Sequence, residues 1–282
     1  MALTARIPAA ADAAGFVPEL WSAKVLDATH TRLVLVPLVD HSWEKELTKG
    51  DTMNIGVLNT VTATEVTIGT EGIINDIATG ALKQIVVNQY YEAPVVIGDM
   101  TDLQSQVNLV AKAQRESGYA VAKQMDTSIA ALFASLNTVR GTDGMSLTDD
   151  LLIASVEEMD EDDVPPDNRY WIFDPSAKAD FLKMDKFVTA DYIRGEDVVK
   201  TGLFGERYGS RIYITNNLAA ATTGNYGCYL HKEALAFIGQ ENNKVDRVEQ
   251  PLKHQITINT TALWGVKEMR DTWGVPIYTR KS

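Results

Sequence analysis

The stretch TGLFGERYGSRIYITNNL, residues 201–218, places three glycines before a run rich in aromatic and β-branched residues. A phosphate-binding loop has the opposite order, because it follows a strand and opens a helix whose N-terminal N–H groups face the anion. Here Gly202, Gly205 and Gly209 precede the expected strand 211–215, and their spacing does not fit G-x-G-x-x-G. The stretch therefore predicts a bend followed by a strand, and it disfavours nucleotide binding.

Length and composition indicate a folded protein with a substantial core. The chain has 282 residues, of which 45% are hydrophobic, enough for one large domain or two. Its 26 basic and 38 acidic residues give a formal net charge of −12, which opposes the broad basic surface that nucleic-acid binding needs. No apolar run has the length of a signal-peptide core or of a membrane span. We therefore expect neither direct binding to nucleic acid nor insertion into a membrane.

Residues 1–48 are expected to form an arm that lies across another part of the protein. An Ala-rich lead is followed by a helical pattern at 18–29, with Trp21 on its apolar face. An apolar extended piece at 33–39 comes next and is broken by Pro37. The segment has too little apolar surface to form a domain of its own.

Residues 49–98 change to the alternating pattern of β-strands. The alternating positions on the outgoing and returning strands are Met53, Ile55, Val57, Ile85, Val87 and Tyr91. A two-stranded ribbon cannot bury both of its faces, and on its own it is only marginally stable in water. We therefore expect a long ribbon whose apolar side chains need cover from outside it.

Residues 101–136 have apolar positions at helical spacing and predict one unusually long helix, with Asp99 or Thr101 as its N-cap. Such a helix would be roughly 50 Å long, more than most single cores require. A bend is expected at Ser117 and Gly118, where the apolar stripe thins. The pattern indicates a strut and not a coiled coil, because the apolar positions hold no strict heptad.

An α/β block is expected to follow the long helix. Helical patterns near 152–159 and at 176–184 flank a short buried strand in RYWIFDP, residues 169–175. Alternation at 255–270 and 275–279 then predicts strands that close against the strut. The expected parts of the chain are an arm at 1–48, a ribbon at 49–98, a helical part at 99–145, an α/β part at 146–244 and returning strands at 245–282.

No group of reactive or metal-binding residues stands out in the sequence. The acidic run Glu157–Asp163 lacks the ligand spacing of an EF-hand loop and predicts a solvated helix end. The four histidines have no metal-ligand spacing, and the G-x-S-x-G motif is missing. The single cysteine, Cys228, excludes an internal disulfide and is expected to be a small buried hydrophobe. We therefore predict no catalytic residue, no cofactor and no metal site.

The order of these parts resembles the HK97-fold major capsid proteins of tailed bacteriophages. In that family they are called the N-arm, the E-loop, the spine helix of the peripheral domain, and the axial domain. RYWIFDPSAKADFLKM, residues 169–184, resembles the family's passage of a strand, Asn/Asp-Pro and a helix. The opening stretch resembles its passage of glycines into a strand that ends in Asn or Asp. The resemblance covers nearly the whole chain and implies an α+β fold with an N-arm, an extended β-hairpin E-loop, a long spine helix and an α/β axial domain.

The resemblance implies a structural protein whose copies form the hexamers and pentamers of an icosahedral phage head. The head would enclose double-stranded DNA without specific binding, and it would assemble in the host cytoplasm. A portal and a separate scaffolding protein are implied, since the arm is short, and a decoration protein is left open. Lys83 and Asn259 match no crosslinking motif, so no crosslink is assigned.

The resemblance also suggests which residues meet neighbouring copies. The glycines of the opening stretch would let a loop bend near the symmetry axis of the capsomer, where bulky side chains would clash. The apolar positions of the arm and the ribbon would be covered by identical subunits. The expected interface residues are Trp21, Met53, Ile55, Val57, Ile85, Val87, Tyr91, Gly202, Gly205 and Gly209.

Three other functions stay open on the sequence alone. An encapsulin-type nanocompartment shell would share the fold but would enclose a cargo enzyme instead of a genome. An α/β enzyme could use the acidic run or Cys228, and intact assembly after substitution of those residues would count against it. A tail or adhesin protein rich in ribbons would form fibres or tubes under the electron microscope.

Overall fold

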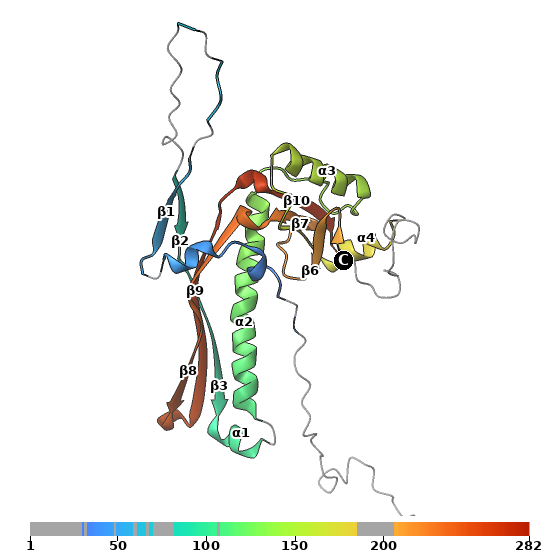
Figure 1. Ribbon diagram of the computed structural model, residues 1–282. Helices are drawn as coiled ribbons and strands as arrows, with labels where there is room; N and C mark the ends of the chain where they lie inside the picture. Colours follow the sequence, from blue (N-terminus) through green and yellow to red (C-terminus); the bar gives the residue numbers. More distant parts are fainter. Residues whose placement is uncertain are drawn as a thin grey trace, which may run out of the picture.

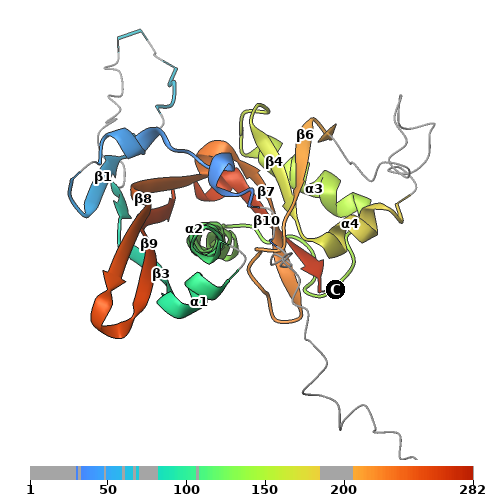
Figure 2. The ribbon, with the colours of Figure 1, turned by 90° about the horizontal axis from the view of Figure 1, so that it is seen from below.

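The computed structural model describes residues 30, 33–47, 49–58, 61–65, 68–69, 82–105, 108–184 and 206–281. Within these residues the chain forms two larger β-sheets and a two-stranded ribbon. Figure 1 shows the long helix α2 standing beside one sheet, with the ribbon projecting beyond its end. Figure 2, in which α2 is seen end-on, shows one larger sheet on each side of the helix.

The first sheet is three-stranded and antiparallel, in the order β3 (Gln89–Gly98), β9 (Gln255–Glu268), β8 (Leu235–Gln250). Its register places Ile97 opposite Ile256 and Val95 opposite Ile258. Ile97 and Ile258 are buried and pack with Ala113 of α2, so one face of this sheet lies on the helix. The apolar alternation of β3 thus reflects packing on α2 and pairing with β9.

The expected single helix at 101–136 is in fact divided. Helix α1 (Asp99–Gln104) ends at Ser105, where the backbone turns extended, and α2 (Leu109–Ala131) continues into a 3-10 turn at Leu132–Ser135. The break has a local cause, because the Asn108 side chain accepts a hydrogen bond from the Ala111 N–H at 3.0 Å and so starts a new helix. The prediction missed this N-cap and placed the helix start at Asp99 or Thr101.

The helix does not break where the bend was expected, because α2 is continuous through Ser117 and Gly118. Ser117 is buried and its hydroxyl lies 2.8 Å from the hydroxyl of Thr260 on β9. The apolar positions are therefore sparse near Ser117 because α2 contacts the three-stranded sheet there through small polar side chains.

The second sheet has five strands among the described residues, and there β4 pairs in parallel with β6 while the other named pairs are antiparallel. Its strands, in spatial order, are β10 (Gly274–Arg280), β7 (Gly224–His231), β4 (Arg169–Phe173), β6 (Ser210–Ile214) and β5 (Glu206–Arg207). Helices α3 (Asp149–Glu161) and α4 (Pro175–Phe181) pack on the face that carries Trp171, whose ring stacks on Tyr229 at 3.8 Å. The opposite face, with Ile172 and Cys228, packs against the end of α2.

The chain crosses between the two sheets twice at the same place. A 3-10 turn at Lys232–Ala234 joins β7 to β8, and another at Asp271–Trp273 joins β9 to β10. The carbonyl oxygen of Ala234 accepts hydrogen bonds from the N–H groups of Met269, at 2.8 Å, and Arg270, at 3.1 Å. The expected boundary between residues 244 and 245 falls within β8, and β10 returns to the five-stranded sheet and not to the strut.

The ribbon consists of β1 (Thr52–Gly56) and β2 (Leu82–Val86), with Met53 opposite Ile85. The alternation from 85 to 91 does not continue in one strand, because β3 starts anew at Gln89 and pairs with β9. At its root the ribbon lies directly on β9, where a Cβ on Gly265 would meet the carbonyl oxygen of Val86 at 2.5 Å.

The described part of the arm is compact where an extended piece was expected. Val36–Leu38 form a 3-10 turn with Pro37 in its first positions, since proline suits the start of a helical turn. A second 3-10 turn follows at Ser42–Lys45, and Asp40 pairs with β8 through hydrogen bonds to Leu235 and Phe237. The expected helix at 18–29 lies outside the described residues. Among the helices of the described residues, none has the length and apolar character of a membrane span.

Candidate assembly surfaces

The root of the ribbon belongs to the core of the chain itself. Ile85 is fully buried and Val87 is 6% exposed, and both pack with Leu47, Ala236 and Ile238. Both were expected to face a neighbouring copy. Their side chains are instead covered by β8 and the arm, because the ribbon crosses the sheet at this point.

Apolar exposure increases along the ribbon away from this root. Met53 and Ile55 are half-buried, whereas Val57 is 41% exposed and Leu82 is 74% exposed. The other exposed apolar residues of this part are Leu58, Val61, Ile68 and Val86. Several exposed apolar side chains on one thin projection indicate a surface that another molecule covers. We call Val57, Leu58, Val61, Ile68, Leu82 and Val86 the ribbon surface.

Tyr91 lies on β3 and not on the ribbon. Its ring stacks on Trp264 with 5.1 Å between the ring centroids, and it covers an indole that is fully buried. Tyr91 itself is 41% exposed and the adjacent Tyr90 is 60% exposed. The edge of the three-stranded sheet therefore presents two aromatic side chains to the surroundings.

A second apolar surface, which the sequence reasoning missed, lies at the far end of the three-stranded sheet. The α1 helix is held there by the Asp99 N–H, which donates to the His254 carbonyl oxygen at 2.9 Å. The exposed side chains at this end are Val96, Met100, Leu103, Val248 and Leu252, which we call the end patch. Met100 and Leu103 have the spacing of a buried helix face. Helical spacing alone does not reveal that this face of α1 is exposed to solvent.

Gly209 occupies a turn that requires its conformation. It follows Tyr208 in the two-residue turn between Arg207 and Ser210, which are paired in the β5–β6 hairpin. The φ angles are +51° at Tyr208 and +73° at Gly209, as in a type I′ hairpin turn. The predicted bend before the strand is confirmed for Gly209. Gly202 and Gly205, like Trp21, lie outside the described residues.

A hollow of about 530 Å³ lies between α3 and this hairpin. Its lining consists of Ile153, Val156, Glu157, Asp160, Glu161 and Tyr208. The hydroxyl of Tyr208 donates to the carboxylate of Asp149 at the start of α3. Burial raises the pKa of Tyr208, and the hydrogen bond to Asp149 raises it further, so this phenol stays protonated.

The acidic run forms the exposed end of α3, as predicted. Two of its carboxylates have basic partners, since Asp160 lies 2.7 Å from Arg169 and Glu158 contacts Arg140. In the part of the chain that the structure describes, no group of His, Cys, Asp and Glu side chains could hold a metal ion. Cys228 is fully buried and burial raises the pKa of its thiol, which leaves it a poor nucleophile. The interpretation of Cys228 as a buried hydrophobe is confirmed.

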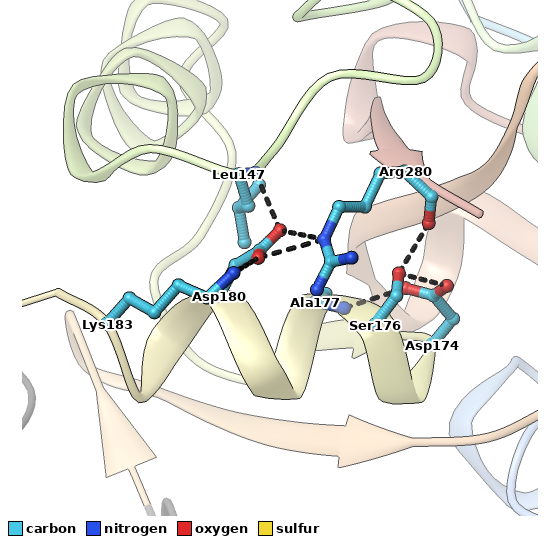
Figure 3. Close-up of polar contacts among 7 residues, drawn as sticks. All are labelled: Leu147, Asp174, Ser176, Ala177, Asp180, Lys183 and Arg280. Carbon is cyan, nitrogen blue, oxygen red and sulfur yellow. Dashed lines mark hydrogen bonds and ion pairs between the residues drawn. The ribbon is translucent and has the colours of Figure 1, made fainter. Parts of the chain in front are cut away.

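A buried polar cluster secures the end of the chain to α4 (Figure 3). The carboxylate of Asp180 accepts from the Leu147 N–H at 3.2 Å and from Arg280 Nε at 2.9 Å. The Ser176 hydroxyl lies between the Asp174 carboxylate, at 2.6 Å, and the carbonyl oxygen of Arg280. These contacts link α4 to β10 and to the segment before α3, which gives the cluster a structural role in positioning β10.

The comparison with protein families matches a phage capsid protein family over residues 95–261. This span runs from β3 through both sheets to β9 and covers more than half of the chain. The chain belongs to the phage capsid protein family. This protein is therefore a structural component of a bacteriophage capsid, and the virion shell is its location.

Solved capsid structures share the fold of the capsid protein over almost its whole length. A structure from Mycobacterium phage Che8 is 22% identical, covers 93% of this chain and 97% of its own, and superposes with a TM-score of 0.82. The capsid structure of Cyanophage P-SCSP1u is 16% identical, with coverages of 95% and 94% and a TM-score of 0.77. The mature capsid of bacteriophage PhiM1 is 14% identical, with coverages of 94% and 93% and a TM-score of 0.75.

The comparison with curated proteins gave no match. The structural matches confirm the expected α+β fold of the HK97 type. With the family match, they favour the phage capsid protein over the other functions that the sequence left open.

Proposed function

We propose that identical copies of this capsid protein form the hexamers and pentamers of an icosahedral head, and that the ribbon surface and the end patch are covered by neighbouring copies. One observation supports this above all. The ribbon surface projects from the body with side chains as exposed as Leu58, at 69%, and Leu82, at 74%. A thin ribbon with such side chains gains stability when an identical subunit covers it.

The packaged genome is enclosed by the shell and not specifically bound. The formal net charge of −12 makes the surface of the protein largely acidic, and like charges repel the phosphate backbone. An acidic interior lets double-stranded DNA be compacted without adhering to the wall. The protein works without catalysis and without a cofactor, and its activity consists of self-association.

Further parts of this proposal concern partners and organisation. A separate scaffolding protein and a portal are the expected partners, a decoration protein is left open, and assembly takes place in the host cytoplasm. In the division of labour that we propose, the arm and the ribbon β1–β2 reach neighbouring copies, and α2 with the three-stranded sheet of β3, β9 and β8 forms the strut. Residues 146–244 then surround the axis of each capsomer, with Gly209 in the hairpin turn.

Electron microscopy of the expressed chain, with and without a candidate scaffolding protein, tests the proposal. Wild type should give closed shells with the scaffold. The double variant Leu58→Ser and Leu82→Ser should stay unassembled with an unchanged melting temperature, because both side chains are already exposed to water in the single chain. Met145→Ser is the matched control, since Met145 is 62% exposed but lies outside both surfaces. Closed shells from the double variant would contradict the assigned role of the ribbon.

The contents of purified shells separate this function from that of a nanocompartment. Shells isolated from infected cells should contain double-stranded DNA. Shells that carry a co-purified enzyme and no genome would contradict packaging.

A further inference from the structure

The spine helix α2 carries a carboxylate on its buried face. Asp126 is fully buried and follows Met125, in a helix face that also contributes Val121 and Ile129 to the main apolar core. A buried carboxylate is strongly unfavourable unless partners replace its lost hydration. Its presence among apolar residues therefore needs an explanation in terms of its partners.

The partners are consecutive backbone N–H groups of the arm. The N–H of Val34 donates to Asp126 Oδ2 at 3.0 Å, and the N–H groups of Leu35 and Val36 donate to Oδ1 at 3.2 Å each. They stand at the start of the 3-10 turn Val36–Leu38, where backbone donors have no acceptor within the turn. Successive N–H groups that converge in this way form a concavity suited to an anion. Asp126 supplies that anion from another element.

Neither side of this contact is satisfied without the other. If the arm left, a carboxylate would remain in an apolar surface, and if the carboxylate were missing, adjacent buried N–H groups would have no acceptor. Apolar contacts by Leu35 and Val39, which are buried in the same core, are not directional and tolerate a shift of the arm. Charge-assisted hydrogen bonds do not tolerate it, because they require a defined geometry.

We propose that Asp126 is the positioning residue of the N-terminal arm, which fixes the register at which the arm crosses α2. Beyond this point the arm is held by Asp40, which pairs with β8, and by His41, whose Nε2 lies 2.7 Å from the carbonyl oxygen of Val36. Asp126 therefore sets where residues 34–36 lie on α2, and with it the starting point of the residues that precede them. That these residues then reach a neighbouring copy rests on the proposed function.

Amide hydrogen exchange on the unassembled full-length chain tests the proposal through Asp126→Asn. This variant keeps the shape of the side chain but replaces one acceptor oxygen by a donor. We expect exchange at residues 34–36 to be at least about tenfold faster than in wild type, because their N–H groups lose a charged acceptor. The amides of Asp40 and Phe237, which donate to backbone carbonyls, should keep their protection.

Asp150→Asn is the matched control, because it makes the same change at an exposed position of α3. It should leave exchange at residues 34–36 unchanged. If Asp126→Asn also leaves it unchanged, apolar contacts alone position the arm and the proposal is overturned. If Asp126→Asn does not fold, Asp126→Glu takes its place, since it keeps the charge and displaces the carboxylate by one methylene. Faster exchange at residues 34–36 supports the proposal and unchanged exchange overturns it.

The readout does not depend on shell formation. A wild-type chain that forms no shells would count against the proposed function and leave the exchange result intact. Shells that form normally while residues 34–36 are equally protected in wild type and variant would count against Asp126 alone.

Discussion

Arg280 Nε lies 2.9 Å from Asp180 Oδ1, and this ion pair joins the last strand of the chain to α4. The side chain of Asp180 is 2% exposed and that of Arg280 is 30% exposed. The same carboxylate accepts the Leu147 N–H in the segment before α3. One carboxylate thus holds three segments that are far apart in the sequence.

We predict that Asp180→Ala lowers the free energy of unfolding by about 3 kcal/mol, because it leaves a partly buried guanidinium and a buried N–H without their acceptor. Chemical denaturation followed by tryptophan fluorescence measures the change, since Trp171 and Trp273 belong to the same core. The control is Glu206→Ala, which removes the exposed ion pair with Arg211. Its effect should be too small to resolve. Equal effects of the two substitutions would show that burial of the pair does not matter.

The hairpin turn predicts opposite outcomes for two substitutions of Gly209. Alanine should destabilise by about 1–2 kcal/mol, because the left-handed conformation at φ +73° is unfavourable for a residue with a Cβ. No atom lies within 4 Å of that Cβ, so no clash contributes. Asparagine should cost clearly less, since it tolerates this conformation. Thermal unfolding of both variants measures the difference, and an alanine variant as stable as the asparagine variant would contradict the assigned turn.

Gly265 should not accept a side chain. A Cβ there would lie 2.5 Å from the Val86 carbonyl oxygen and 2.9 Å from the Val87 Cα, which are backbone atoms of the ribbon root. We expect Gly265→Ala to destabilise by about 1–3 kcal/mol, as overpacking does in cores. Hydrogen exchange should also be faster in β2, because the ribbon is pushed off the sheet.

Gly118 provides the contrast within α2. A Cβ on Gly118 meets no atom within 4 Å, so Gly118→Ala should stabilise the protein by roughly 1 kcal/mol through helix propensity. The two melting temperatures should therefore move in opposite directions. A destabilised Gly118→Ala variant would indicate a contact at this position that a single chain does not contain.

Asp126 should also leave a signature in the pH dependence of stability. Burial raises its pKa above the ordinary value, although the hydrogen bonds from Val34, Val36 and Leu35 and the side chain of Asn217 act in the opposite direction. The folded chain therefore binds a proton more tightly than the unfolded chain. By linkage, the contribution of Asp126 to the free energy of unfolding is greatest below its pKa in the unfolded chain. This contribution is lost as pH rises through its pKa in the folded chain.

The measurement compares wild type with Asp126→Asn in urea denaturation at several pH values. The stability of wild type relative to the variant should increase as pH falls from 7 toward 4. A difference that is constant over this range would show that the carboxylate titrates normally.

Local signals in the sequence predicted the elements that local interactions form. In RYWIFDPSAKADF the Asp174 side chain caps α4 by accepting the Ala177 N–H at 3.1 Å, and Pro175 takes the first helical position. The end of the strand before it, Trp171–Phe173, is apolar because both faces of the strand are covered. These features all act within a few residues, so the pattern alone identifies them.

The sequence did not predict the pairing of strands that are far apart in the chain. The alternation from Ile85 to Tyr91 reads as one strand, yet β3 leaves the ribbon to pair with β9, which follows it by more than 150 residues. The sequence also did not reveal that Met100 and Leu103 are exposed, because they have the spacing of a buried helix face. Asp126 gave no signal either, since its role depends on N–H groups that precede it by about 90 residues.

The double crossing at Ala234 has a mechanical consequence. The β7–β8 and β9–β10 connections meet at the carbonyl oxygen of Ala234, so the sheets cannot pivot about one of these connections without straining the other. A shell that fits the same subunit into rings of five and rings of six needs some part to give way. We expect that compliance in the thin projections and the turns at their bases, where fewer such contacts restrain the chain.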